Sequence, residues 1–256
     1  MVVKSMTVTA AVLLMAVMPA AAVDDEDKVA FVENNLLYIL FHEAGHAVID
    51  QFGLPVLGQE EDAADAFATI EIMNVYEDPL PILADSAIAQ FIMDERLDGD
   101  YDVSDYYGSH DLDIQRGYRV ICHAVGIEPD EYLVLAEDLG LDRDRIETCE
   151  DEGWLAAESW EVLLEPSFIA EDEISSNVVN QYDIDGLSAP QESLLLDNGL
   201  MDEFSAYLSE TFDWPAPVTV TIELCNEANA FYDPATVTIS MCAEFVDELI
   251  DLAADL

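Results

Sequence analysis

Two histidines and a glutamate lie close together in the run His42-Glu43-Ala44-Gly45-His46, an H-E-x-x-H sequence. If this segment is helical, the two imidazoles lie one turn apart on one face and can reach a single metal ion. Zinc accepts imidazole ligands and lowers the pKa of a bound water to about 7. Glu43 would then act as the general base that takes a proton from the zinc-activated water.

A catalytic zinc site needs a third protein ligand and an open fourth position. Glu61 lies in the first turn of the next expected helix, so a helix-loop-helix turn could bring it back to the metal. Asp65 lies one turn further on and could accept a hydrogen bond from the other ring nitrogen of a ligand histidine. Glu60 and Asp62 are alternatives for the third ligand. Glu61 is preferred because it shares a helix face with Asp65.

A second polar segment ends in His110, at an expected junction between a loop and a helix. His110 could take part in catalysis by donating a hydrogen bond to the oxyanion of a tetrahedral intermediate. Tyr106 and Tyr107 are alternatives, and a capping or packing role is open to all three. Arg116 and Arg119 are expected to be buried ion-pair partners rather than substrate clamps.

The helices that must position these groups can be predicted from apolar spacing. The segment 32–52 suits a largely buried helix that stops at Gly53 and Pro55. The next helix begins at Glu60, where an acidic first turn faces the positive end of the helix dipole. Further helices are expected at residues 82–97, 112–125, 143–164, 194–212 and 243–256, and residues 99–109 are expected to form a loop.

Strands are predicted only late in the chain, where apolar and polar residues alternate over 218–224 and 237–241. A type I turn at 233–236 would pair residues 229–232 antiparallel to 237–240. We therefore predict an α+β fold that is mostly helical, with a small antiparallel sheet in the C-terminal third. One domain is expected over 23–256, comprising a helical metal-site part at 28–165, a connector at 166–193 and a final part at 194–256.

The charge balance is strongly acidic, with 56 Asp and Glu residues against 7 Lys and Arg and a formal net charge of −49. A surface of this kind argues against nucleic acid and anionic lipid as partners. Its self-repulsion is screened when the Debye length falls to about 3 Å near 1 M salt, so we hypothesise adaptation to a saline environment. An acidic calcium-binding protein is the alternative, but no EF-hand loop pattern is present.

Residues 1–22 have the features of a secretory signal peptide. Lys4 supplies the positive charge, residues 8–18 form the apolar region, and Ala20-Ala21-Ala22 form the small-residue cleavage site. Cleavage is expected before Val23. The apolar run is too short for a membrane-spanning helix, so we expect a periplasmic or secreted protein without membrane insertion after cleavage.

The four cysteines are an even set, and export would favour their oxidation to two disulfides. Of the three possible connectivities, the sequence-local one pairs Cys122 with Cys149 and Cys225 with Cys242. The predicted hairpin register supports the second pair because it brings Cys242 close to Cys225. A zinc site made of cysteines is the alternative, but no C-x-x-C spacing is present.

These segments resemble a bacterial metallopeptidase-like family, a domain of unknown function related in its motif to the gluzincins. The resemblance covers residues 41–47, 54–65, 110–116 and 225–234. It implies a zincin-like fold that binds Zn²⁺, and it does not establish a substrate. In this family the segment like 225–234 precedes the zinc helix, whereas here it follows, so we interpret the chain as circularly permuted.

The sequence as a whole predicts an exported zinc metallopeptidase that hydrolyses a peptide or protein substrate. Its metal ligands would be His42, His46 and Glu61, with Glu43 as general base. The alternative is a catalytically silent zinc-binding or protein-interaction module outside the cytoplasm.

Overall fold

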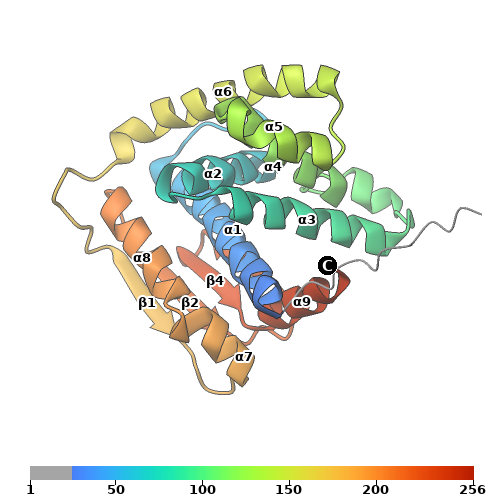
Figure 1. The fold of residues 1–256 in the computed structure, drawn as a ribbon. Coiled ribbons are helices and arrows are strands. Elements are labelled where there is room, and N and C mark those ends of the chain that lie inside the picture. Colours follow the sequence, from blue (N-terminus) through green and yellow to red (C-terminus); the bar gives the residue numbers. More distant parts are fainter. Residues whose placement is uncertain (1–24) are drawn as a thin grey trace, which may run out of the picture.

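A computed structural model describes residues 25–256, and the expected signal peptide lies outside them. Helix α1 (Asp25–Phe52) runs through the middle of the molecule, with a sheet on one side and the other long helices on the opposite side (Figure 1). Apolar residues on all sides of α1 are buried, and Phe31, Leu40 and Val48 have no exposed surface. Because α1 is enclosed in this way, groups on it have fixed positions.

Helix α1 ends where the sequence predicts but begins earlier. Gly53 follows its last residue with a φ of +62°, a left-handed conformation that glycine adopts without strain. The predicted start was Val32, whereas the helix begins at Asp25. Its first turn contains three acidic residues, which the positive end of the helix dipole stabilises.

Five further helices pack beside α1 or behind its immediate neighbours. Helices α2 (Glu60–Val75) and α3 (Leu80–Leu97) contact α1 directly, and α4 (Asp113–Ile127) packs on both of them. Helix α6 (Arg143–Leu164) packs on α4, and a short helix, α5 (Pro129–Asp138), which the sequence analysis did not predict, lies between them in the chain. The predicted loop contains one 3₁₀ turn, η1 (Val103–Tyr106).

A glycine allows α2 to come close to α1 beside the H-E-x-x-H sequence. A Cβ atom added to Gly45 would lie only 3.0 Å from the Cα of Ala64 on α2. The absence of a side chain at Gly45 therefore lets the two antiparallel helices approach closely. This approach brings the acidic first turn of α2 next to the histidines.

The sheet of the described residues is mixed, which corrects the predicted antiparallel sheet. Its strands are β1 (Val178–Tyr182), β2 (Val218–Glu223), β3 (Ala230–Asp233) and β4 (Thr238–Cys242), in the order β1-β2-β4-β3. The hairpin of β3 and β4 is antiparallel as predicted, with Ala230 opposite Met241. However, β2 pairs in parallel with both β4 and β1. Strand β3 of the hairpin lies at the outer edge of the sheet. Strand β2 therefore pairs with the side of β4 that faces away from β3.

The predicted connector at 166–193 contains regular structure of its own. It provides β1 and the short helix α7 (Ala189–Glu192), after a 3₁₀ turn, η2 (Glu165–Ser167). The helix predicted at 194–212 is divided into a π-helical turn, η3 (Ser193–Asp197), and α8 (Leu200–Thr211). Gly199, with a φ of +86°, separates the two parts. The mostly helical α+β class is as predicted.

The last helix, α9 (Glu244–Leu252), ends in a 3₁₀ turn, η4 (Ala253–Asp255), and packs against α1. Both predicted disulfides are present. Cys122–Cys149 joins α4 to α6, and Cys225–Cys242 joins the segment after β2 to the end of β4. Over residues 25–256, no helix combines the length and apolar content needed to cross a bilayer.

Candidate metal and catalytic site

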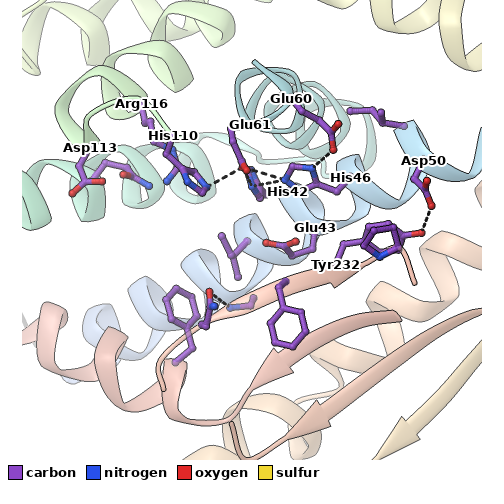
Figure 2. A pocket seen from close by; sticks show the side chains of 18 of the residues that line it. His42, Glu43, His46, Asp50, Glu60, Glu61, His110, Asp113, Arg116 and Tyr232 are labelled. Atoms are coloured by element: carbon purple, nitrogen blue, oxygen red, sulfur yellow. Dashed lines mark hydrogen bonds and ion pairs between the residues drawn. The ribbon is translucent and has the colours of Figure 1, made fainter. Parts of the chain in front are cut away.

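The two motif histidines converge with a carboxylate from the neighbouring helix. The Nε2 atoms of His42 and His46 lie 3.2 Å apart. The Oε2 atom of Glu61, at the start of α2, lies 3.2 Å from the Nε2 of His42 and 3.1 Å from that of His46. Three donor atoms from two helices therefore face one point (Figure 2).

The spacing of these donors fits a divalent cation such as zinc. In a tetrahedral site with ligand bonds of about 2.0–2.2 Å, neighbouring donor atoms lie about 3.3–3.6 Å apart. The observed 3.1–3.2 Å separations would need to widen by only a few tenths of an ångström. Two imidazoles and one carboxylate are also a ligand set that catalytic zinc accepts. His42, His46 and Glu61 could thus hold a metal ion, as predicted.

Asp65 lies where an orienting carboxylate is expected. The Nδ1 of His42 donates to Oδ1 of Asp65 at 2.8 Å, which points its Nε2 toward the other two donors. The guanidinium of Arg116 on α4 donates two hydrogen bonds of 2.9 Å to the Asp65 carboxylate. Although burial acts in the opposite direction, Arg116 and His42 hold the pKa of Asp65 well below its usual range. Asp65 is therefore a buried, charged anchor for His42.

The histidines are themselves affected by these acids. Burial lowers the pKa of His42, but the hydrogen bonds to Asp65 and Glu61 outweigh burial and raise that pKa to about 9. For His46 the same competition also ends in a raised pKa, through Glu61 and Glu60. Burial raises the pKa of Glu61, but its histidine neighbours, His110 first, lower it by more. The pKa of Glu61 therefore lies well below its usual range. The cluster therefore combines an anionic carboxylate with imidazoles that hold protons strongly.

The structure assigns different surroundings to the two alternatives for the third ligand. Glu60 accepts a hydrogen bond of 2.9 Å from the Nδ1 of His46. It therefore orients His46 in the same way that Asp65 orients His42. The spacing of residues in the sequence did not predict this role for Glu60. Asp62 instead pairs with Arg119, which also pairs with Asp111. The predicted ion pairing of Arg119 is thereby confirmed.

Glu43 is buried beside the three donors and lies between them and strand β3 (Figure 2). The backbone N–H of Tyr232 on β3 donates to its carboxylate. Burial raises the pKa of Glu43 above its ordinary value, and the nearby histidines offset this only partly. A carboxylate in this environment is a stronger base than one in water, which suits a proton acceptor.

His110 lies on the other side of Glu61 from His46 (Figure 2). Its Nε2 lies 2.9 Å from the Oε2 of Glu61, and its side chain is 48% exposed. Tyr106 and Tyr107, the alternatives to His110, are exposed and do not line the cavity. A tyrosine that the sequence analysis did not consider for the site, Tyr232, does line it.

The three possible metal donors border one open cavity of about 900 Å³, together with Glu43, Glu60, His110 and Tyr232. Its walls come from α1, the first residues of α2, helices α3 and α4, and strand β3. A cavity of this size can receive a substantial ligand beside the metal donors. Possible metal donors, a basic glutamate and an open cavity together define a candidate site for a metal-dependent hydrolase.

Comparison with known families is consistent with that class. The chain belongs to a family described as "Putative metallopeptidase", and the match covers residues 10–164 and 186–255. No curated protein and no solved structure matches the chain significantly. The family assignment agrees with the resemblance found in the sequence.

Proposed function

We propose that the chain is an exported, zinc-dependent metallopeptidase that hydrolyses peptide bonds. The observation that carries this proposal is the convergence of His42, His46 and Glu61 beside a buried Glu43 in an open cavity. Membership of the metallopeptidase family supports it. The two disulfides and the signal-like residues 1–22 support export, because disulfides persist in oxidising compartments.

His42, His46 and Glu61 would hold the cation, which would polarise the substrate carbonyl and acidify water. Glu43 takes a proton from the attacking water and passes it to the leaving amine as the peptide bond breaks. His110, exposed at the cavity wall, donates to the oxyanion that develops on the former carbonyl. Asp65 and Glu60 hold the two ligand histidines in position.

The test compares wild-type protein with Glu43→Gln in metal content and in cleavage of a broad peptide library. We expect one zinc per chain in both proteins, and a fall in cleavage rate of about 10²–10⁴-fold in the variant. Hydrolysis that survives Glu43→Gln would contradict the proposed mechanism. A wild-type protein that binds zinc and cleaves no peptide would favour the catalytically silent binding module instead.

Export is tested separately by expressing the full chain and sequencing the N-terminus of the mature product. We expect the product outside the cytoplasm, beginning at Val23. Retention of residues 1–22 on a cytoplasmic product would contradict this part of the proposal.

A further inference from the structure

The cavity extends along α1 in both directions from Glu43. Ile39 lies one helical turn before Glu43, and Asp50 lies about two turns after it, and both line the cavity. At a rise of 1.5 Å per residue, these positions are about 16 Å apart. An extended peptide rises about 3.3 Å per residue, so about five substrate residues could lie between the two ends. The chemistry of each end therefore bears on substrate preference.

The carboxylate at the Tyr232 end already has partners. Asp50 is exposed and accepts hydrogen bonds from the hydroxyl of Tyr232 at 2.7 Å and from Nε2 of Gln51 at 2.8 Å. Both neutral donors bind its Oδ2, and because Asp50 is exposed, solvent can reach its other oxygen. This carboxylate therefore has no need of a cationic ligand.

The carboxylate at the other end is different. Asp113, the first residue of α4, lies beyond His110 as seen from Glu61 (Figure 2) and is half-buried. No hydrogen bond or ion pair joins its side chain to another described residue, and the nearby Arg116 gives its two hydrogen bonds to Asp65. Burial accordingly raises the pKa of Asp113, with Arg116 offsetting part of the effect. A half-buried carboxylate without a donor is costly to keep charged.

A second acceptor at this end also lacks a donor. The side-chain oxygen of Gln90 on α3 is buried and has no hydrogen-bond partner among the described residues. Gln90 and Asp113 line the same cavity together with three half-buried apolar side chains, Ile39, Met93 and Phe245. A ligand that fits would pass an apolar stem between these side chains and bring hydrogen-bond donors to the two acceptors. Lysine and arginine side chains have this form.

We propose that this end of the cavity is a specificity pocket for a lysine or arginine side chain of the substrate, with Asp113 and Gln90 receiving its cationic end. The inference rests on the proposed peptidase function and adds the class of substrate. General surface acidity does not explain the feature, because Asp113 is half-buried in the wall of the cavity while most acids of this chain are exposed. Asp113 and Gln90 are thus assigned to substrate binding.

The test measures binding apart from cleavage. Two alanine-rich peptides that differ only in one residue, arginine or the uncharged isostere citrulline, are titrated into zinc-loaded Glu43→Gln protein by calorimetry. We expect the arginine peptide to bind about tenfold more tightly, since hydrogen bonds to a charged donor are the stronger ones. Adding Asp113→Asn should bring the ratio of the two dissociation constants to about one, and adding Gln90→Leu should reduce it.

The matched control is Asp50→Asn, which removes one negative charge from the opposite end of the cavity and should leave the ratio near tenfold. Equal binding of the two peptides, or a ratio that falls with Asp50→Asn and not with Asp113→Asn, overturns the inference.

The same peptide pair is then offered to the wild-type enzyme. If binding shows the preference and no peptide is cleaved, the pocket stands and the proposed function fails. If peptides are cleaved without preference, the proposed function stands and the specificity pocket fails.

Discussion

The His42 imidazole is fixed through both of its ring nitrogens. Its Nδ1 donates to Asp65, and Arg116 holds Asp65 from a third helix, so a chain of charged contacts runs from α4 through α2 to α1. This arrangement fixes the tautomer of His42 and the direction of its Nε2. Because Asp65 and Arg116 are both almost fully buried, removing either partner leaves a charge without compensation.

Replacing Asp65 with asparagine should therefore weaken metal binding and the fold together. We expect zinc affinity to fall about 10–100-fold, as for other carboxylates that orient ligand histidines. The free energy of unfolding should fall by about 3–5 kcal/mol, because Arg116 becomes an uncompensated buried charge. Competition with a chelator and urea denaturation measure the two effects. Glu60→Gln is the control, since Glu60 is 53% exposed and should cost less stability. Equal losses in both variants would refute this role for Asp65.

Metal affinity should also depend on pH. The pKa of His42 in the metal-free protein is raised to about 9, so the imidazole is protonated at neutral pH and must lose that proton to bind a cation. Apparent zinc affinity should rise about tenfold per pH unit from pH 7 toward 9 and then level off. The stability of the metal-free fold should have the opposite pH dependence. The contribution of His42 to the free energy of unfolding is fully present below about pH 6.5 and is lost as the pH rises through 9. Calorimetry in buffers of different ionisation enthalpy counts the proton released, and a count of zero at pH 7 would contradict the prediction.

At the scale of residues, the sequence was most informative where spacing within one helix decides the geometry. The turn between His42 and His46, and that between Glu61 and Asp65, follow from helical periodicity alone. The role of Glu60 depends on the rotation of α2 about its axis, which spacing does not determine. Tyr232 comes from a strand far along the chain, so only the tertiary fold brings it to the site.

At the scale of elements, α4 and α6 are held in unusually close contact. A Cβ atom added to Gly126 on α4 would lie 2.4 Å from the carbonyl oxygen of Cys149 and 2.5 Å from the Cα of Gly153, both on α6. The disulfide Cys122–Cys149 links the same two helices. Since α4 provides Arg116 and Asp113, this contact stabilises the helix behind the site.

Gly126→Ala should force the two helices apart. We expect the free energy of unfolding to fall by about 1–3 kcal/mol despite the better helix propensity of alanine, because backbone atoms cannot move aside as a flexible side chain would. Gly58→Ala is the matched control, since nothing lies within 4 Å of an added Cβ there. Thermal denaturation of both variants is the measurement. A Gly126→Ala protein at least as stable as the Gly58→Ala protein would show that the helices are less tightly packed than described.

The elements that the sequence analysis missed share a physical cause. Helix α5 buries little beyond Tyr132 and Ala136 and leaves Val134 exposed, so it has no clear apolar stripe. Strand β1 is an edge strand whose three central residues are exposed, so it shows no alternation. Where one face is buried, as in β2 with its regular alternation of burial, the prediction was accurate.

At the scale of the whole molecule, the charge balance sets the conditions under which the fold is stable. With 56 acidic and 7 basic residues, few carboxylates can find a cationic partner. Some of the arginines join separate parts of the chain, as Arg96 on α3 does with Asp251 and Asp255 near the C-terminus. The remaining acids repel one another across the surface.

Stability should therefore rise with salt. We expect the melting temperature to increase steadily from about 0.1 M to 1 M NaCl, as the Debye length falls from about 10 Å to about 3 Å. Matched potassium chloride and an uncharged osmolyte separate screening from other solvent effects, since only the salts should act in the low range. A melting temperature that is flat or falls over this range would contradict the hypothesis of adaptation to a saline environment.

Topology is the level at which the sequence was least informative. The sheet is mixed because β2 lies parallel to both β4 and β1, whereas β3 is antiparallel to β4. The pairing of β1 was not predicted because 166–193 was interpreted as a connector. The circular permutation inferred from the order of the family segments stays a prediction. The packing of α9 against α1 is an arrangement that such a permutation requires.

The central claim is that His42, His46 and Glu61 bind one divalent cation between them. The most direct test is a crystal structure of the zinc-loaded protein with anomalous data collected on both sides of the zinc absorption edge. We expect one strong anomalous peak about 2.0–2.2 Å from the Nε2 atoms of both histidines and from a carboxylate oxygen of Glu61. A fully loaded protein with its anomalous peak elsewhere, or with none near these three side chains, would contradict the account.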